Sequence, residues 1–276
     1  MINLAFNDIQ WDRKTYVMGI INSTPDSFSG DGISGDVKAG ISLGLKFFES
    51  GADLLDIGGE STRPPSLYRD VKEISGEEEI DRIVPVIEGI RANSTGMISV
   101  DTSKSTVADA AIRAGASMVN DVWALKKDPE MAQVIADAEV HVVLMHNEIN
   151  PDYGDVVYDT IEGLKKSVDN AVRMGISEEL IIIDPGIGFG KNTRENLTIL
   201  SRLEEYKSIG RPVLIGTSRK STIGTVLQLP VRERRYGTAA TVAIAIAKNV
   251  NIVRVHDVVE MVQVCAMSDA IIRGKL

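Results

Sequence analysis

Apolar residues cluster in short runs along the chain, and each run ends in a polar or charged residue before a segment with helical spacing. The runs are rich in β-branched residues and none alternates cleanly between apolar and polar positions, which predicts strands buried on both faces, as in a parallel sheet. The expected strands are 16–21, 53–57, 97–100, 117–119, 141–145, 180–183, 212–215 and 251–255.

The segments between these runs carry apolar residues at the spacing of an amphipathic helix. Gly51 and Gly115 follow two of them at the position where a helix commonly ends in a left-handed residue. Ser75 precedes an acidic first turn as a helix cap would. The expected helices are 36–49, 77–90, 105–114, 130–138, 159–174, 194–206, 238–248 and 258–273.

Eight strand–helix units without a linker predict an α/β protein that folds as a single (β/α)₈ TIM barrel over residues 1–276. A doubly wound open sheet is the alternative, because periodicity alone does not establish closure. In a barrel, the functional groups lie at the C-terminal ends of the strands, so we expect the active site there.

Net charge and cysteine content indicate which kinds of partner and which cellular compartment to expect for this chain. The chain has 276 residues and a formal net charge of −9, which argues against a general nucleic-acid or acidic-membrane surface. Its one cysteine, Cys265, permits no internal disulfide, and no signal-peptide pattern or membrane-length apolar run is visible. We therefore expect a cytoplasmic protein that binds neither nucleic acid nor membrane.

Polar side chains collect at the predicted strand ends, where burial is costly unless they meet a ligand or one another. Asp101, Asn120 and Asp184 offer acceptors and an amide, which suit a flat, nitrogen-rich ring with a guanidine-like edge. A second set is cationic and suits phosphate or carboxylate groups. Its members are Arg63, Arg219, Lys220, Arg254 and His256.

Two other patterns give little evidence for a functional site. The glycine-rich segment 184–191 departs from a P-loop, because Pro185 replaces its first glycine, and it predicts a turn instead. The three histidines, His141, His146 and His256, lack the spacing of zinc ligands.

Eight segments, taken together and in this order, resemble the dihydropteroate synthase family, a group of (β/α)₈ barrels. They are Met18-Gly-Ile-Ile-Asn-Ser-Thr-Pro-Asp-Ser-Phe28, Asp56-Ile-Gly-Gly-Glu-Ser-Thr-Arg-Pro64, Ser99-Val-Asp-Thr102, Val119-Asn-Asp121, Leu144-Met-His146, Asp184-Pro-Gly-Ile-Gly-Phe-Gly-Lys191, Ser218-Arg-Lys-Ser221 and Arg254-Val-His-Asp257. The resemblance implies condensation of 6-hydroxymethyl-7,8-dihydropterin diphosphate with 4-aminobenzoate, giving 7,8-dihydropteroate and diphosphate by a dissociative displacement. It also implies a homodimer.

The resemblance also implies roles for individual residues. Those expected to bind the pterin are Asp101, Asn120, Met145, Asp184, Gly216 and Lys220. Those expected to hold the diphosphate are Asn22, Thr62, Arg63, Arg254 and His256. Those expected to bind 4-aminobenzoate are Thr62, Pro64, Phe189, Lys220 and Ser221.

Catalysis and metal binding follow from the same resemblance. The residues expected to act in catalysis are Asn22, Asp31, Arg63, Lys220, Arg254 and His256. Asn22 would also ligate a Mg²⁺ ion that neutralises the diphosphate leaving group. Two loops rich in Gly, Ser and Pro, 23–36 and 61–75, are expected to order only around the pterin diphosphate. We therefore predict that 4-aminobenzoate binds well only after that substrate.

Two other functions remain open from the sequence. A methyltetrahydrofolate-type methyltransferase would share the pterin acids but would not need the segments that begin at Asn22 and Ser218. A catalytically silent pterin-binding paralogue would not need the retained cations Lys220 and Arg254. Diphosphate release with and without 4-aminobenzoate separates these functions.

Overall fold

The computed structural model describes residues 9–24, 36–60, 73–149 and 151–274. Eight parallel strands form one sheet in the order β6-β5-β4-β3-β2-β1-β8-β7, and a parallel bridge between Ile183 and Val213 joins its two ends. The sheet is therefore a barrel, and the prediction of eight parallel strands is confirmed. The strands are β1 (Tyr16–Asn22), β2 (Leu54–Gly58), β3 (Met97–Asp101), β4 (Met118–Asp121), β5 (His141–Met145), β6 (Ile181–Asp184), β7 (Leu214–Ile215) and β8 (Ile252–Val255).

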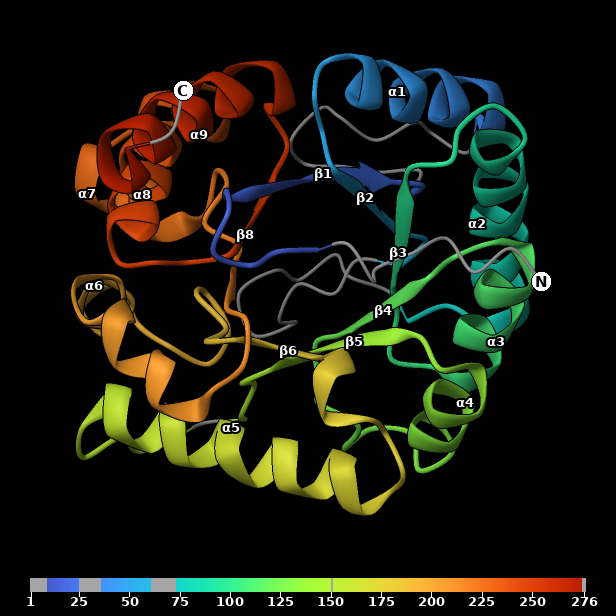
Figure 1. Cartoon of the computed structure of the whole chain (residues 1–276), viewed down its shortest axis with the longest axis horizontal. Coiled ribbons are helices and arrows are strands. Elements are labelled where there is room, and N and C mark those ends of the chain that lie inside the picture. The colour runs from blue at the N-terminus through green and yellow to red at the C-terminus, as the bar shows by residue number, and fades with distance from the viewer. Residues whose placement is uncertain (1–8, 25–35, 61–72, 150, 275–276) are drawn as a thin grey trace.

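Helices surround the strands in chain order, so that α1 to α9 run once around the barrel (Figure 1). The α-helices are α1 (Val37–Glu49), α2 (Gly76–Arg91), α3 (Ser105–Ala114), α4 (Met131–Ala138), α5 (Val156–Arg173), α6 (Thr193–Ser201), α7 (Ser221–Leu227), α8 (Arg235–Ala247) and α9 (Val258–Arg273). Short 3₁₀ helices lie at η2 (Glu178–Leu180), η3 (Leu203–Ile209) and η4 (Val231–Glu233). Among the described residues, no helix combines the length and apolarity needed to cross a membrane.

Three helix predictions differ from the structure by three or more residues at one end, and one of them is 238–248, since α8 begins at Arg235. The segment 194–206 was expected as one helix, but α6 ends at Ser201, whose hydroxyl donates to the Thr198 carbonyl, and a 3₁₀ helix follows. Such side-chain bonds to the backbone compete with helix continuation. Helix α5 begins at Val156 rather than 159, because the Asp155 carboxylate accepts from two backbone N–H groups and caps it.

Alternate residues along each strand divide the apolar side chains into two cores. Residues of one parity, such as Leu55, Val119 and Ile183, pack between the strands and the helices. Residues of the other parity fill the barrel interior. Further along each strand, toward its C-terminal end, residues of this parity also face the interior. The interior core consists of Tyr16, Met18, Leu54, Met118, Val143, Ile182, Leu214 and Ile252.

Candidate active site

The interior positions beyond this core carry most of the residues expected to bind the pterin. Because side chains alternate along a strand, the residue two places after each core residue also faces the interior. Asp101 reaches the same layer from β3, since it pairs in register with Asn120. On β2, β4, β5, β6, β7 and β8, the residues that follow the core residues by two places are Asp56, Asn120, Met145, Asp184, Gly216 and Arg254.

Arg254 joins three of these strand ends across the barrel. Its Nε donates to Asp56 Oδ2 at 2.5 Å and its NH2 donates to Asp101 Oδ2 at 2.7 Å. Asn120 Nδ2 donates to the same Asp56 oxygen at 2.9 Å. The guanidinium thus offsets two buried carboxylates and fixes their orientation.

Asp101 keeps one acceptor free for a ligand. Its Oδ1 is buried without a hydrogen-bond partner in the structure. Burial raises the pKa of Asp101 to about 7, and the positive charge of Arg254 opposes that rise. A ligand that donates N–H groups to Asp101 would therefore favour its ionised form.

Asp184 presents a second buried carboxylate from the end of β6. Its Oδ1 accepts from the backbone N–H of Gly186 at 2.7 Å. Burial raises the pKa of Asp184, and the charge of Lys220 lowers it. Met145 ends the neighbouring strand and pairs with Asp184 in register, so it forms an apolar part of the same wall.

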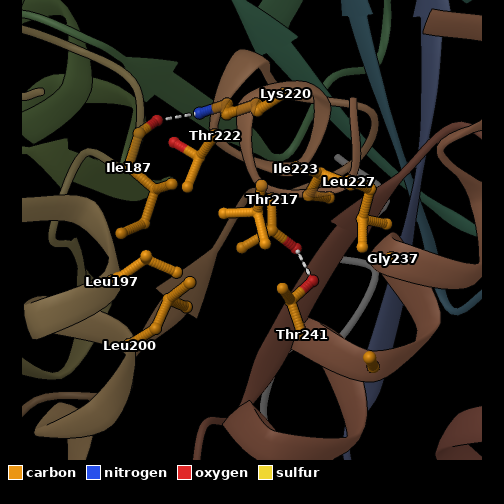
Figure 2. A pocket seen from close by; sticks show the side chains of 12 residues that line it. Ile187, Leu197, Leu200, Thr217, Lys220, Thr222, Ile223, Leu227, Gly237 and Thr241 are labelled. Atoms are coloured by element: carbon orange, nitrogen blue, oxygen red, sulfur yellow. Dashed lines mark hydrogen bonds between the residues drawn. The ribbon is translucent and has the colours of Figure 1, made fainter. Parts of the chain in front are cut away.

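Lys220 faces this layer from the loop after β7. Its Nζ donates to the carbonyl oxygen of Ile187 (Figure 2) and lies 4.6 Å from the centroid of the Phe189 ring. Burial lowers the pKa of Lys220 to about 8, and the charge of Asp184 opposes this shift. Gly216 borders the same arrangement, since a Cβ there would lie at an ordinary contact distance of 3.9 Å from both Lys220 Nζ and Arg254 Cβ.

The remaining described candidates lie around this group. The ring Nδ1 of His256 is 2.9 Å from Ser218 Oγ, which joins the loops after β7 and β8. Asn22 is half-buried at the end of β1, and Ser221 is exposed at the first position of α7. Arg219, which we expected to face an anion, donates to both oxygens of the Asp257 carboxylate, at 3.0 and 2.7 Å.

Comparison with known proteins identifies the family to which this arrangement belongs. The family model described as pterin binding enzyme matches residues 18–256. A dihydropteroate synthase of Clostridium beijerinckii is 46% identical over 95% of this chain and 96% of its own length. The chain belongs to the dihydropteroate synthase family.

Solved structures of dihydropteroate synthases agree with the fold. The Clostridium difficile enzyme, determined in the presence of pteroic acid, superposes with a TM-score of 0.89 at 42% identity, covering 96% of this chain and 99% of the other. The Xanthomonas albilineans enzyme with 4-aminobenzoic acid gives a TM-score of 0.86 at 40% identity, covering 94% of each chain.

Four of the residues singled out by their resemblance to dihydropteroate synthases lie outside the described part of the chain. They are Asp31, Thr62, Arg63 and Pro64. The same holds for most of the two loops expected to order around the pterin diphosphate, so their expected behaviour stays a prediction.

Two residues to which the sequence assigned no role, Asp56 and Lys191, take part in the geometry of this dihydropteroate synthase site. Asp56 meets both Arg254 and Asn120, and its place two residues after Leu54 was the available signal. Lys191, set aside with its glycine-rich segment, is buried, and its Nζ donates to the carbonyl oxygens of His146, Gly186 and Phe189. No simple sequence pattern predicts the contacts of Lys191, because the three carbonyl groups come together only in the folded chain.

Proposed function

We propose that this chain condenses 6-hydroxymethyl-7,8-dihydropterin diphosphate with 4-aminobenzoate to give 7,8-dihydropteroate and diphosphate. The observation that carries the proposal is the interior layer, in which buried acceptors from β3, β4 and β6 face Lys220 and Arg254. Asp101, Asn120 and Asp184 would accept from and donate to the pterin edge, with Met145 and Gly216 shaping the pocket. The C. difficile relative was solved in the presence of pteroic acid, which supports a pterin in this layer.

The second substrate and the leaving group would lie above the pterin. Phe189 and Lys220 are in contact and, together with Ser221, Thr62 and Pro64, would bind 4-aminobenzoate. The X. albilineans relative solved with 4-aminobenzoic acid supports this substrate class. His256, Arg254, Asn22, Thr62 and Arg63 would hold the diphosphate.

The proposed reaction is a dissociative displacement at the exocyclic carbon of the dihydropterin. The bond to the diphosphate oxygen breaks first, because the ring delocalises the positive charge. The amine nitrogen of 4-aminobenzoate then forms the new bond and loses a proton. The chain would contribute positioning, cationic stabilisation of the leaving group by Lys220 and Arg254, and exclusion of water.

A coupled assay tests the proposal. Purified enzyme is incubated with the pterin diphosphate and Mg²⁺, and diphosphate release is followed with and without 4-aminobenzoate. We expect release to depend on 4-aminobenzoate and to match dihydropteroate formation one for one. A methyl transfer from a methylated folate, or pterin binding without turnover, would contradict it.

The donor set of the described residues fits a magnesium ion that arrives with its substrate. Asn22 offers one neutral amide oxygen, and the described residues contain no group of three or more His, Cys, Asp or Glu side chains that could hold a metal. One neutral oxygen is a weak ligand for an ion that dehydrates reluctantly. Asn22 would therefore hold Mg²⁺ together with diphosphate oxygens, and Mg²⁺ would neutralise the leaving group.

This donor set predicts that Mg²⁺ and diphosphate bind cooperatively. Titration calorimetry with Mg²⁺ should show tight binding only after diphosphate is added, because the phosphate oxygens complete the coordination shell. Ca²⁺, which accepts more irregular shells, serves as the comparison ion. Tight Mg²⁺ binding to the free enzyme would contradict the prediction and would indicate a carboxylate site.

We also propose that residues 1–276 form a single domain, because the barrel from β1 to β8 spans residues 16–255 and the family match spans 18–256. A homodimer in the cytoplasm is the expected assembly and location, with the pterin diphosphate and 4-aminobenzoate as its small-molecule partners. Light scattering of the purified enzyme tests the dimer.

A further inference from the structure

A buried lysine joins the two loops that follow β5 and β6. Lys191 is 9% exposed. Its Nζ lies 3.2 Å from the carbonyl oxygen of His146, 3.2 Å from that of Gly186 and 3.0 Å from that of Phe189. The Nδ1 atom of the His146 ring is 3.3 Å away. All of these partners are neutral, so Lys191 does not take part in any of the described ion pairs.

The backbone around this lysine is packed so closely that two of its positions admit only glycine. Gly186 and Gly190 have φ of +74° and +59°, and a Cβ at these glycines would lie 2.1 Å from the carbonyl oxygen of His146 and 2.4 Å from that of Glu148. The turn after β6 therefore rests directly on the loop after β5. Carbonyl oxygens that meet in this way need donors, and the ammonium of Lys191 supplies them.

The turn held by Lys191 carries two groups of the proposed site. The Ile187 carbonyl accepts from Lys220 Nζ, and the Phe189 ring lies under the same ammonium. On its other side, Asn196 of α6 fixes the turn, since its Oδ1 accepts from Gly188 N at 2.8 Å and its Nδ2 donates to the Lys191 carbonyl at 3.1 Å.

We propose that Lys191 is a positioning residue for the second substrate, acting through the turn that places Phe189 and Lys220. Burying a cation among neutral groups costs far more than burying an apolar chain of the same length. The ammonium offsets that cost only by satisfying carbonyls that hold the turn in one conformation. The inference rests on the proposed function, because it assigns Phe189 and Lys220 to the 4-aminobenzoate site.

The test compares Lys191→Met with wild type and with Lys166→Met, an exposed lysine of α5. In Lys191→Met, we expect KM for 4-aminobenzoate to rise about tenfold to a hundredfold, because a displacement of about 1 Å can cost that much. Affinity for a pterin analogue should fall less than affinity for 4-aminobenzoate. Asp184 and Lys220 do contact this turn, through Gly186 and Ile187, but Asp101 and Asn120 lie on strands that the substitution leaves alone. Lys166→Met should match wild type.

Rescue by a small amine separates positioning from packing. Propylammonium replaces the atoms that Lys191→Ala deletes beyond Cβ, and it should lower KM for 4-aminobenzoate, whereas the uncharged analogue propanol should not. Equal rescue by propanol, or equal losses for both substrates, would overturn the proposal.

Two further outcomes are built into the design. If Lys191→Met does not fold, Asn196→Ala loosens the same turn from α6 and must show the same selective loss for 4-aminobenzoate. If wild type forms dihydropteroate and neither variant changes KM, only this inference fails. If wild type forms none, the proposed function fails.

Discussion

Replacing Asp184 with asparagine is expected to weaken binding of a pterin analogue by about 2–4 kcal/mol, or roughly 30- to 700-fold. The carboxylate is buried and would accept two N–H groups from the pterin edge, and asparagine turns one acceptor into a donor that faces those groups. Stability should change little, because the amide oxygen still accepts from Gly186 N. Calorimetry with the analogue measures the loss.

The matched control is Asp169→Asn, which removes an exposed carboxylate from α5. It should bind the analogue as wild type does. Binding within about threefold of wild type by Asp184→Asn would remove Asp184 from the pterin site.

Replacing Arg254 with methionine is expected to lower the free energy of unfolding by about 3–5 kcal/mol at pH 8, because it leaves two buried carboxylates, Asp56 and Asp101, without their cation. Burial already raises the pKa of Asp101 to about 7. In the folded state, this group binds a proton that the unfolded chain releases at lower pH, so stability falls as pH rises from the unfolded pKa towards 7.

Loss of Arg254 should raise that folded pKa further, so the fall in stability should continue to higher pH. We therefore expect the penalty of Arg254→Met to be smaller at pH 6 than at pH 8, as measured by urea unfolding at both values. Arg254→Lys keeps the charge but not the forked geometry, and should lose less stability. An equal penalty at both pH values would show that the carboxylates do not carry the effect.

Much of the fold follows from local patterns in the sequence. Runs of β-branched residues marked all eight strands, and the polar residue that ends each run marked Asp101, Asn120 and Asp184 as neighbours. This succeeded because parallel strands in a barrel all end on the same face. The split of 194–206 into two helices was missed, because it depends on side-chain bonds near Ser201 rather than on apolar spacing.

The sequence indicates which strand carries each site residue, but it does not indicate which groups that residue contacts. Arg254 was grouped with the phosphate-binding cations, yet its guanidinium pairs with carboxylates of β2 and β3. That pairing requires the last strand, β8, to lie beside β1 and thus near β2 and β3, which the pattern of any one strand does not reveal. Lys191 was missed for a related reason, since its acceptors belong to residues 146, 186 and 189 and converge only through the packing of two loops.

Neighbouring strands of this barrel are not paired over equal lengths. Strand β7 is two residues long, and a single bridge between Ile183 of β6 and Val213, the residue before β7, pairs this side of the sheet with β6, whereas β1 and β2 pair over five residues. Opening should therefore begin at this seam, and its amides should lose protection from hydrogen exchange before those between β1 and β2. Asp184 and Gly216 stand just beyond the seam on its two sides. The same looseness that weakens the fold there would let the pterin pocket widen without unfolding the rest of the barrel.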